Sequence, residues 1–273
     1  MWKRYVALSA GGAVGIAVVA AFARPGAGGQ SPAKSEASGA PRDALAVPVV
    51  VELFTSEGCS SCPPADALLA RLETTQPVEG ARIVPLAFHV DYWDELGWPD
   101  PFASPSYTAR QRTYASVDGR MYTPQAVVGG RTELVGSDAS GLVQAIRAAG
   151  RRPRATVELG VRRDGSGLET TVRVGALPGV PAAAPGTAAV VYVALTQAEA
   201  DVEVRRGENG GRTLHHTAIV RRFVAAGPVG GSGGEVHAKL ELPTGIPVAA
   251  LRVVAFVQRD GRDIVAAETQ ALR

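Results

Sequence analysis

The chain contains two cysteines, and both belong to one Cys-x-x-Cys unit formed by Cys59 and Cys62. The unit follows the apolar run 49–54, which predicts a buried strand, and precedes Pro63 and Pro64, which suit the first turn of a helix. A thiol at a helix start faces unpaired backbone N–H groups and the positive end of the helix dipole, which stabilise the thiolate. This placement predicts a redox-active pair in which Cys59 is the exposed nucleophile and the buried Cys62 resolves the mixed disulfide.

Two other roles for the cysteine pair remain open. A disulfide that closes so short a loop restricts the unfolded chain little, so a structural staple would contribute near the bottom of the usual range of about 0 to 5 kcal/mol. A closed zinc site needs about four ligands, and the further candidates are His89, His215, His216 and His237. We predict no cofactor and no bound metal, with Cu(I) or another soft metal on the two thiolates and His89 as the alternative.

The N-terminal segment predicts export from the cytoplasm. Residues 1–23 begin with basic residues, continue through an apolar stretch and end in an A-x-A cleavage pattern at positions 21–23, as signal peptides do. An uncleaved membrane anchor is the alternative, because the stretch is close to the roughly 20 residues that span a bilayer. Residues 24–47, rich in Gly, Ala, Ser and Pro, predict a flexible linker. The folded part is therefore expected in the periplasm or outside the cell, with membrane contact only through this N-terminal segment if it is uncleaved.

Charge and length limit the classes of partner and of architecture. The formal net charge is +2, from 28 Lys and Arg against 26 Asp and Glu, and this near-neutrality argues against a nucleic-acid partner. The 273 residues leave, after the leader, one large domain or two ordinary ones.

Residues 48–152 combine strand and helix patterns. A strand, a helix after the cysteine pair and a second strand in that order predict parallel strands joined by a right-handed crossover. The loop that follows contains Tyr92, Trp93 and Trp98, which could form a lip over the cysteine pair or simply pack on the core. The later expected elements are a helix at 106–116, strands near 125–128 and 132–135, and a helix capped by residue 137 or 138 that ends near 149.

The order of these elements, the Cys-x-x-Cys at the first helix and Thr123-Pro124 before the third strand resemble the thioredoxin fold. The resemblance implies a cis Pro124 that shapes the substrate groove beside the disulfide, with the backbone of Thr123 pairing with the bound chain. It also implies a buried acid on the preceding strand that relays a proton for the resolving thiol, and Glu52 is the matching residue.

A closer resemblance covers nearly the whole exported chain. The segments 51–66, 89–94 and 122–125 are similar to those of an exported bacterial thioredoxin-like family of unknown function, DUF1223. The likeness supports the fold and supplies no reaction.

Residues 153–273 show no helical pattern. Alternating, β-branched runs separated by Gly and Pro turns predict a small antiparallel sandwich without catalytic groups, its strands near 155–161, 168–174, 189–195, 218–223, 236–242 and 251–258. His215 and His216 are neighbours on a strand, so they should point to opposite faces.

The sequence therefore predicts an α/β thioredoxin-like domain at 48–152 followed by a small all-β sandwich-like domain at 153–273. The predicted function is an exported thiol-disulfide oxidoreductase. Its partners would be protein thiol or disulfide clients and a redox partner in the cell envelope. A soft-metal or protein-binding module on the same scaffold is the alternative.

Overall fold

A computed structural model of the chain describes residues 46–115, 121–182 and 188–273. The predicted leader and all but the end of the predicted linker lie outside the described residues. Within those residues, no helix combines the length and the apolar character needed to cross a membrane.

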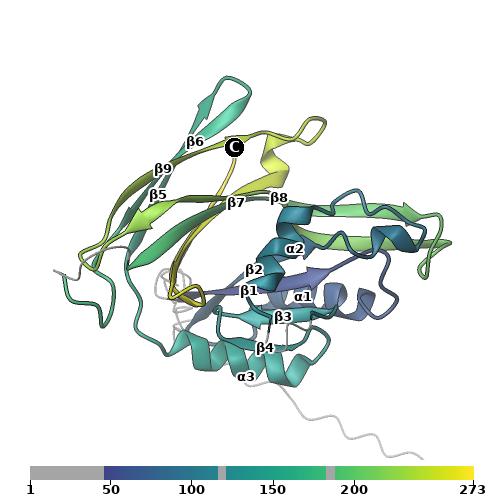
Figure 1. Cartoon of the computed structure of the whole chain (residues 1–273), viewed down its shortest axis with the longest axis horizontal. Helices are drawn as coiled ribbons and strands as arrows, with labels where there is room; N and C mark the ends of the chain where they lie inside the picture. The colour runs from purple at the N-terminus through teal and green to yellow at the C-terminus, as the bar shows by residue number, and fades with distance from the viewer. Residues whose placement is uncertain (1–45, 116–120, 183–187) are drawn as a thin grey trace, which may run out of the picture. The chain divides into compact units, whose positions relative to one another are not determined.

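Two sheets and three α-helices make up the described fold (Figure 1). The large sheet has eight strands in the order β11-β10-β7-β8-β2-β1-β3-β4. Its strands are β1 (Val47–Thr55), β2 (Ala81–His89), β3 (Gln125–Val128), β4 (Thr132–Val135), β7 (Ala189–Val204), β8 (Arg212–Val229), β10 (Leu251–Arg259) and β11 (Asp263–Ala271). The small sheet has the order β5-β6-β9, from β5 (Val157–Asp164), β6 (Gly167–Val174) and β9 (Gly234–Glu241). The helices are α1 (Pro63–Thr75), α2 (Pro105–Arg112) and α3 (Ala139–Gly150), with short 3-10 turns η2 (Asp94–Leu96) and η3 (Val248–Ala250).

The local elements of the first half form where the sequence indicates them. β1 and β2 pair in parallel, and α1 connects them, as the strand-helix-strand order predicts. α1 starts with Pro63 because proline lacks the N–H that the first helical turn leaves unpaired. Asp138 caps α3 by accepting a hydrogen bond from the backbone N–H of Gly141.

The expected fold class, an α/β thioredoxin-like domain followed by a small all-β sandwich-like domain, is wrong. The large sheet takes strands from both halves of the described chain, because β8 pairs in parallel with β2 through Ala87 and Ile219. Strands β7 and β8 have 16 and 18 residues, much longer than the runs expected from the sequence, and β11 was not expected. Contacts between strands so far apart in the sequence leave no local pattern, so the patterns of the two halves do not indicate that they share a sheet. The expected domain boundaries stay a prediction.

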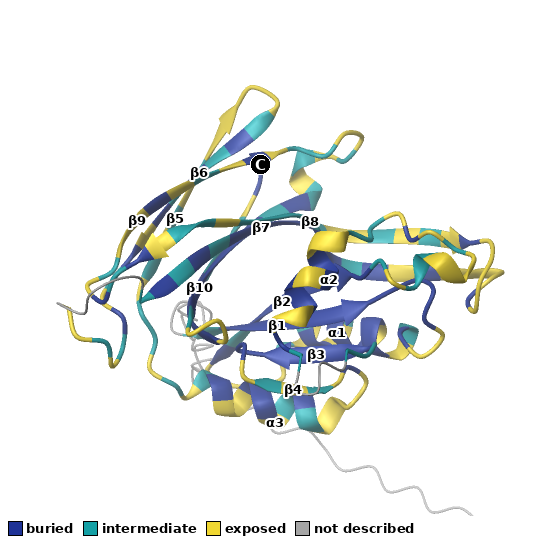
Figure 2. Ribbon diagram, viewed as in Figure 1, coloured by how far each residue is buried: buried dark blue, intermediate teal, exposed yellow. Residues whose placement is uncertain are grey.

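Side chains from both faces of β1 are buried. Val49, Val51 and Leu53 pack in one cluster with residues of α1 and α3, whereas Val50 and Phe54 pack in another with residues of α2, β8 and β10. This alternation arises because successive side chains of a strand point to opposite faces of the sheet. A third cluster fills the space between the small sheet and strands β7, β10 and β11. β1 is buried along most of its length (Figure 2). Because it is covered on both sides, its end at Thr55 is fixed, and the cysteine turn begins there.

Candidate functional site

Cys59 and Cys62 form a disulfide, with their Cα atoms 5.4 Å apart. The pair lies in the turn that leads from β1 to α1. In this turn the N–H of Cys59 donates to the carbonyl of Ser56 (3.2 Å) and the N–H of Cys62 donates to the carbonyl of Cys59 (3.1 Å). Cys62, and not Cys59, occupies the N-cap of α1, and the helix begins at Pro63, as the two prolines indicated.

Both cysteines are completely buried, although Ser60 and Ser61 between them are exposed. The expectation of an exposed Cys59 beside a buried Cys62 is therefore wrong. The cysteine turn also contacts a distant segment, the tip of the β7–β8 hairpin, residues 205–211.

The tip of the hairpin is hydrogen-bonded to the cysteine turn. The side-chain amide of Asn209, which is fully buried, donates to the backbone carbonyls of Glu57 (2.9 Å) and Cys59 (3.0 Å). The carboxylate of Glu208 accepts a hydrogen bond from the N–H of Ser60 at 3.0 Å. Residues of the second half therefore contact the cysteine turn through three hydrogen bonds.

The tryptophans of the loop after β2 lie beside the same turn. The indole N–H of Trp98 donates to Glu57 Oε2 at 2.6 Å, and that of Trp93 donates to Thr123 Oγ1 at 2.8 Å. Gly58 lets Trp93 approach, because a Cβ atom on Gly58 would lie 3.0 Å from Trp93 Cβ. The loop thus brings both of its tryptophans to the turn.

Three further residues of the predicted site are Tyr92, Thr123 and Pro124. Tyr92 donates its hydroxyl to Gln111 at 3.2 Å and is 37% exposed. The Thr123-Pro124 peptide bond is cis, as predicted, and the carbonyl of Pro124 accepts from the N–H of Gly136. Thr123 is joined to the cysteine turn through Trp93.

Glu52 belongs to a different buried network. Its carboxylate accepts from Arg110 Nε (2.9 Å) and Nη2 (3.2 Å) and from the hydroxyl of Tyr114 (2.5 Å). Arg110 also donates to Gln258 at 2.7 Å, and its guanidinium lies 5.0 Å from the ring centre of Tyr192. These contacts tie β1 to α2, β7 and β10, so the geometry favours a structural role for Glu52 over the predicted proton relay.

A cluster of five buried ionisable side chains lies next to the disulfide turn: Glu57, Asp66, His89, Asp100 and His216. We call it the buried ionisable cluster. His89 Nδ1 and Asp100 Oδ2 are 2.7 Å apart, and the same oxygen accepts from the backbone N–H of Glu57 at 2.9 Å. His216 Nε2 lies 3.3 Å from Glu57 Oε1, and His216 Nδ1 lies 4.0 Å from Asp66 Oδ2. The ring centres of the two histidines are 4.8 Å apart.

The members of this cluster shift one another's pKa. Burial lowers the pKa of His89, but the charge and hydrogen bond of Asp100 outweigh it and raise that pKa above its ordinary value. Burial opposes ionisation of Asp100, yet His89 and the backbone N–H groups of Glu57 and Phe102 bring its pKa below the ordinary value. Burial raises the pKa of Asp66, partly opposed by the two histidines. The pKa values of His89, Asp100 and Asp66 are therefore coupled through burial and their charges.

Several polar atoms of the cluster lack a hydrogen-bond partner among the described residues. They are Glu57 Oε1, His89 Nε2 and both ring nitrogens of His216; Glu57 Oε1 and His216 Nε2 lie close without hydrogen-bond geometry. Buried polar atoms normally have partners, so this cluster is a candidate functional site.

No group of three or more His, Cys, Asp or Glu in the described part of the chain has the geometry to hold a metal ion. His215 and His216 do point to opposite faces: half of the His215 side chain is exposed beside Asp201, and that of His216 is buried.

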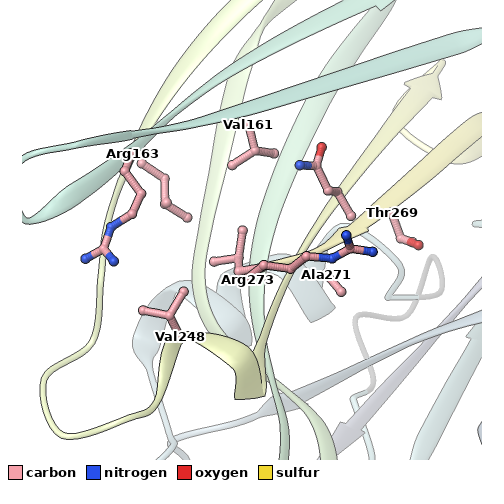
Figure 3. A pocket seen from close by; sticks show the side chains of 9 residues that line it. Val161, Arg163, Val248, Thr269, Ala271 and Arg273 are labelled. Carbon is pink, nitrogen blue, oxygen red and sulfur yellow. The ribbon is translucent and has the colours of Figure 1, made fainter.

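A pocket of about 530 Å³ lies away from the disulfide, between the small sheet and the C-terminal residues. Its lining includes Val161, Val248, Ala271 and two arginines, Arg163 and Arg273. The two guanidinium groups point in different directions and do not converge on one point (Figure 3).

Sequence reasoning found the disulfide and its aromatic neighbours and missed Asn209, Asp66, Asp100 and His216 as parts of one site. The Asn-Gly-Gly turn that contains Asn209 marked a hairpin tip, but nothing local indicates which surface the tip contacts.

Comparison with known proteins places the chain in one family. The model of the family described as "Protein of unknown function (DUF1223)" matches residues 50–258. An X-ray crystal structure of a protein from Agrobacterium tumefaciens is 33% identical, with a TM-score of 0.60, over 83% of this chain and 95% of that one.

Two other solved structures are much less similar. The sporulation control protein Spo0M from Bacillus subtilis has a TM-score of 0.30 at 12% identity, over 44% of this chain and 49% of its own. A hypothetical protein from Pyrococcus horikoshii has a TM-score of 0.24 at 12% identity, over 45% of this chain and 90% of its own. No curated protein matches the chain. From the family match and the Agrobacterium structure, the chain belongs to the DUF1223 family, whose function is unknown.

Proposed function

We propose that the protein exchanges disulfides with protein clients through Cys59 and Cys62. The observation that carries this proposal is the position of the disulfide, at the start of a helix and beside the buried ionisable cluster. A purely structural staple in so short a loop would contribute little to stability, and it would need no titratable groups beside it.

The exchange is a two-electron, two-proton reaction. A client thiolate attacks one sulfur of the Cys59–Cys62 disulfide, the S–S bond breaks, and a mixed disulfide forms while the displaced cysteine takes a proton. A second client thiolate attacks the client sulfur of the mixed disulfide and releases the other cysteine, which also takes a proton. The client leaves as a disulfide and the protein as a dithiol. The reverse sequence reduces a client disulfide.

Burial of the two sulfurs makes the source of these protons important. A thiolate in an apolar environment is disfavoured, so reduction needs protons at the moment the S–S bond breaks. In our proposal His216 supplies them. It lies between Glu57, two residues before Cys59, and Asp66, whose backbone N–H donates to the carbonyl of Cys62 at 3.1 Å.

Clients must also reach the sulfurs. We propose that the tip of the β7–β8 hairpin moves away from the cysteine turn, which breaks the hydrogen bonds from Asn209 and exposes the turn. Trp93, Trp98, Tyr92 and Thr123 would then border the bound client, with Pro124 beside them.

A measured reduction potential tests the exchange. The protein is equilibrated in glutathione buffers of graded potential, quenched with acid and alkylated, and the modified cysteines are counted by mass. We expect a value between roughly −120 and −270 mV, whereas a structural disulfide lies below about −300 mV. A Cys62→Ser variant should accumulate mixed disulfides with peptide clients that contain a disulfide, because the Cys59 thiolate displaces one client thiolate and no second cysteine resolves the product. The reduced unmodified protein should instead release its clients as dithiols. A potential below the structural limit, or no mixed disulfide, contradicts the proposal.

The neighbouring histidines provide a matched test of the proton source. His216→Asn should slow reduction of the disulfide by a dithiol and change the pH dependence of that rate. His215→Asn, one residue away on the exposed face, should leave both unchanged. Equal behaviour of the two variants would remove His216 from the mechanism.

The proposed place of action is the periplasm or the exterior of the cell, where disulfides persist. The predicted partners are client proteins and an envelope protein that restores the redox state of the pair. N-terminal sequencing of the protein from the cell envelope should give a start near Arg24, and a start at Met1 in the membrane fraction would instead indicate an uncleaved anchor.

A further inference from the structure

A second pocket, of about 340 Å³, lies between the segment that starts α2 and the middle of β8. One part of its wall is apolar and aromatic, from Phe102, Phe223 and Val224. The other part is cationic, from Arg221 and Arg222. Its volume is at the lower end of the range for small-molecule sites, which usually combine an apolar wall with a few polar groups.

A β-bulge puts both arginines in this pocket. Leu195 of β7 pairs with Arg222, and the next residue, Thr196, pairs with Val220, so Arg221 is an extra residue in β8. In a regular strand neighbouring side chains point to opposite faces, and a bulge turns one of them. The bulge therefore explains how two consecutive arginines line a single pocket.

Neither of these two arginines forms a short ion pair with a carboxylate of the described residues. Arg221 stacks over the ring of Phe102 at 4.9 Å, and its polar contact is a long one of 3.4 Å to Gln197. Arg222 reaches a carboxylate oxygen of Glu241 only at 4.0 Å, and that side chain is 91% exposed. Among the described residues, no carboxylate lies within 4.0 Å of the Arg221 guanidinium. Burial and the neighbouring charge of Arg222 lower the pKa of Arg221, although Tyr107 opposes this shift.

We propose that this pocket binds a small organic carboxylate, with its anionic group between Arg221 and Arg222 and its apolar body against Phe102 and Phe223. Two guanidinium groups without a close internal partner match a carboxylate, which each can bind through paired N–H groups. The aromatic wall favours an organic acid over a bare inorganic anion, because an inorganic anion would leave that wall without a partner.

The proposed site is distinct from the disulfide. The ring of Phe102 separates it from the histidines, with ring centres 5.2 Å from His89 and 5.7 Å from His216. The binding proposal therefore does not depend on disulfide exchange, and it can be measured with the oxidised protein.

Titration calorimetry and thermal unfolding of the full-length protein test the proposal with two probes, benzoate and inorganic phosphate, at constant ionic strength set with sodium chloride. We expect benzoate to bind and to raise the unfolding midpoint, with a shift that grows with the logarithm of the benzoate concentration above its Kd, and phosphate to bind at least about tenfold more weakly. Arg221→Gln and Arg222→Gln should each weaken benzoate binding by about tenfold or more. Arg147→Gln, an exposed arginine on α3, should bind benzoate as the unmodified protein does.

Circular dichroism and the midpoint without ligand show whether each arginine variant is folded. If Arg221→Gln does not fold, Phe223→Leu provides the second variant, because it shortens the aromatic wall and should weaken benzoate more than phosphate. Equal binding of phosphate and benzoate would overturn the assigned ligand class. If benzoate shows no binding beyond that of the sodium chloride control, the proposed site is wrong. The site is also wrong if Arg147→Gln and both pocket variants bind benzoate with equal affinity.

Discussion

The side-chain amide of Asn209 donates a hydrogen bond to the backbone carbonyl of Cys59, a residue 150 positions earlier in the chain. This contact, with its companion to Glu57, joins the tip of the β7–β8 hairpin to the disulfide turn. The outer parts of both strands alternate between exposed residues and buried or half-buried ones, and Val204 and Leu214 are the buried apolar residues on either side of the tip (Figure 2). The reactivity of the disulfide should therefore depend on a hairpin that contains no cysteine.

Asn209→Ala should make the disulfide easier to reduce. Two hydrogen bonds are worth roughly 1 to 3 kcal/mol together, so we expect dithiothreitol to reduce the variant about fivefold faster or more. Quenched alkylation followed by mass measurement gives the rate. His215→Ala, on the exposed face of the same hairpin, is the control. A variant rate at or below that of the unmodified protein would show that the tip does not limit access.

The His89–Asp100 pair should make stability depend on pH. The pKa of His89 is raised above 6.5, so its stabilisation is complete below that value and is lost as pH rises through the folded pKa. The pKa of Asp100 is lowered from 3.8, so its contribution is present above that value and is lost as pH falls through the folded pKa. The pair should thus stabilise most between pH 3.8 and 6.5.

Urea unfolding at graded pH checks this window. The raised pKa of Asp66, like that of His89, makes the stability fall as pH rises. Glu57 and His216 are the other ionisable groups that face the pair. We expect the unmodified protein to lose more stability between about pH 6 and pH 9 than His89→Gln does. A His215→Gln variant should follow the unmodified protein, and parallel curves for His89→Gln and the unmodified protein would count against the pair.

The sequence predicted the position of most strands and helices, because periodicity, prolines and capping residues are local signals. It located the cysteine turn for the same reason. It failed for the pairing of β2 with β8 and for the contact of Asn209 with the turn, since both depend on segments that are far apart in the chain. The prediction of a separate fold for each half rested on these local patterns alone.

The role of Glu52 shows a second limit. An acid on the strand before the cysteines resembled a proton relay, but the sequence does not indicate that Arg110, on α2, occupies both of its oxygens. In a sequence, a buried carboxylate that transfers a proton cannot be distinguished from one that forms an ion pair, because the partner residue is not indicated.

Glu52→Gln should destabilise the fold strongly. It leaves the buried Arg110 charge without its partner, which typically costs about 3 to 5 kcal/mol. Arg110→Met should cost a similar amount, and the double variant should cost less than the sum of the two. Urea unfolding measures all three, with Arg162→Gln, in an exposed pair with Glu169, as a control of small effect. Slower disulfide exchange in Glu52→Gln without loss of stability would instead support the proton relay.

Gly58→Ala should disturb the turn before Cys59. The added Cβ would lie 3.0 Å from Trp93 Cβ, and overpacking of this kind typically costs about 1 to 3 kcal/mol. Gly230→Ala, where the added atom meets open space, should change the unfolding free energy by less than about 0.5 kcal/mol. Similar unfolding free energies for the two variants would show that the loop of Trp93 adapts.

The pairing of β2 with β8 has a consequence for any attempt to produce half of this protein. A chain cut near residue 152 would leave β2 as an edge strand in one fragment and β8 as an edge strand in the other. Unpaired edges with apolar side chains recruit other strands, so each half should self-associate or precipitate when made alone. Mixed during refolding, the two halves should instead find each other and restore a soluble complex.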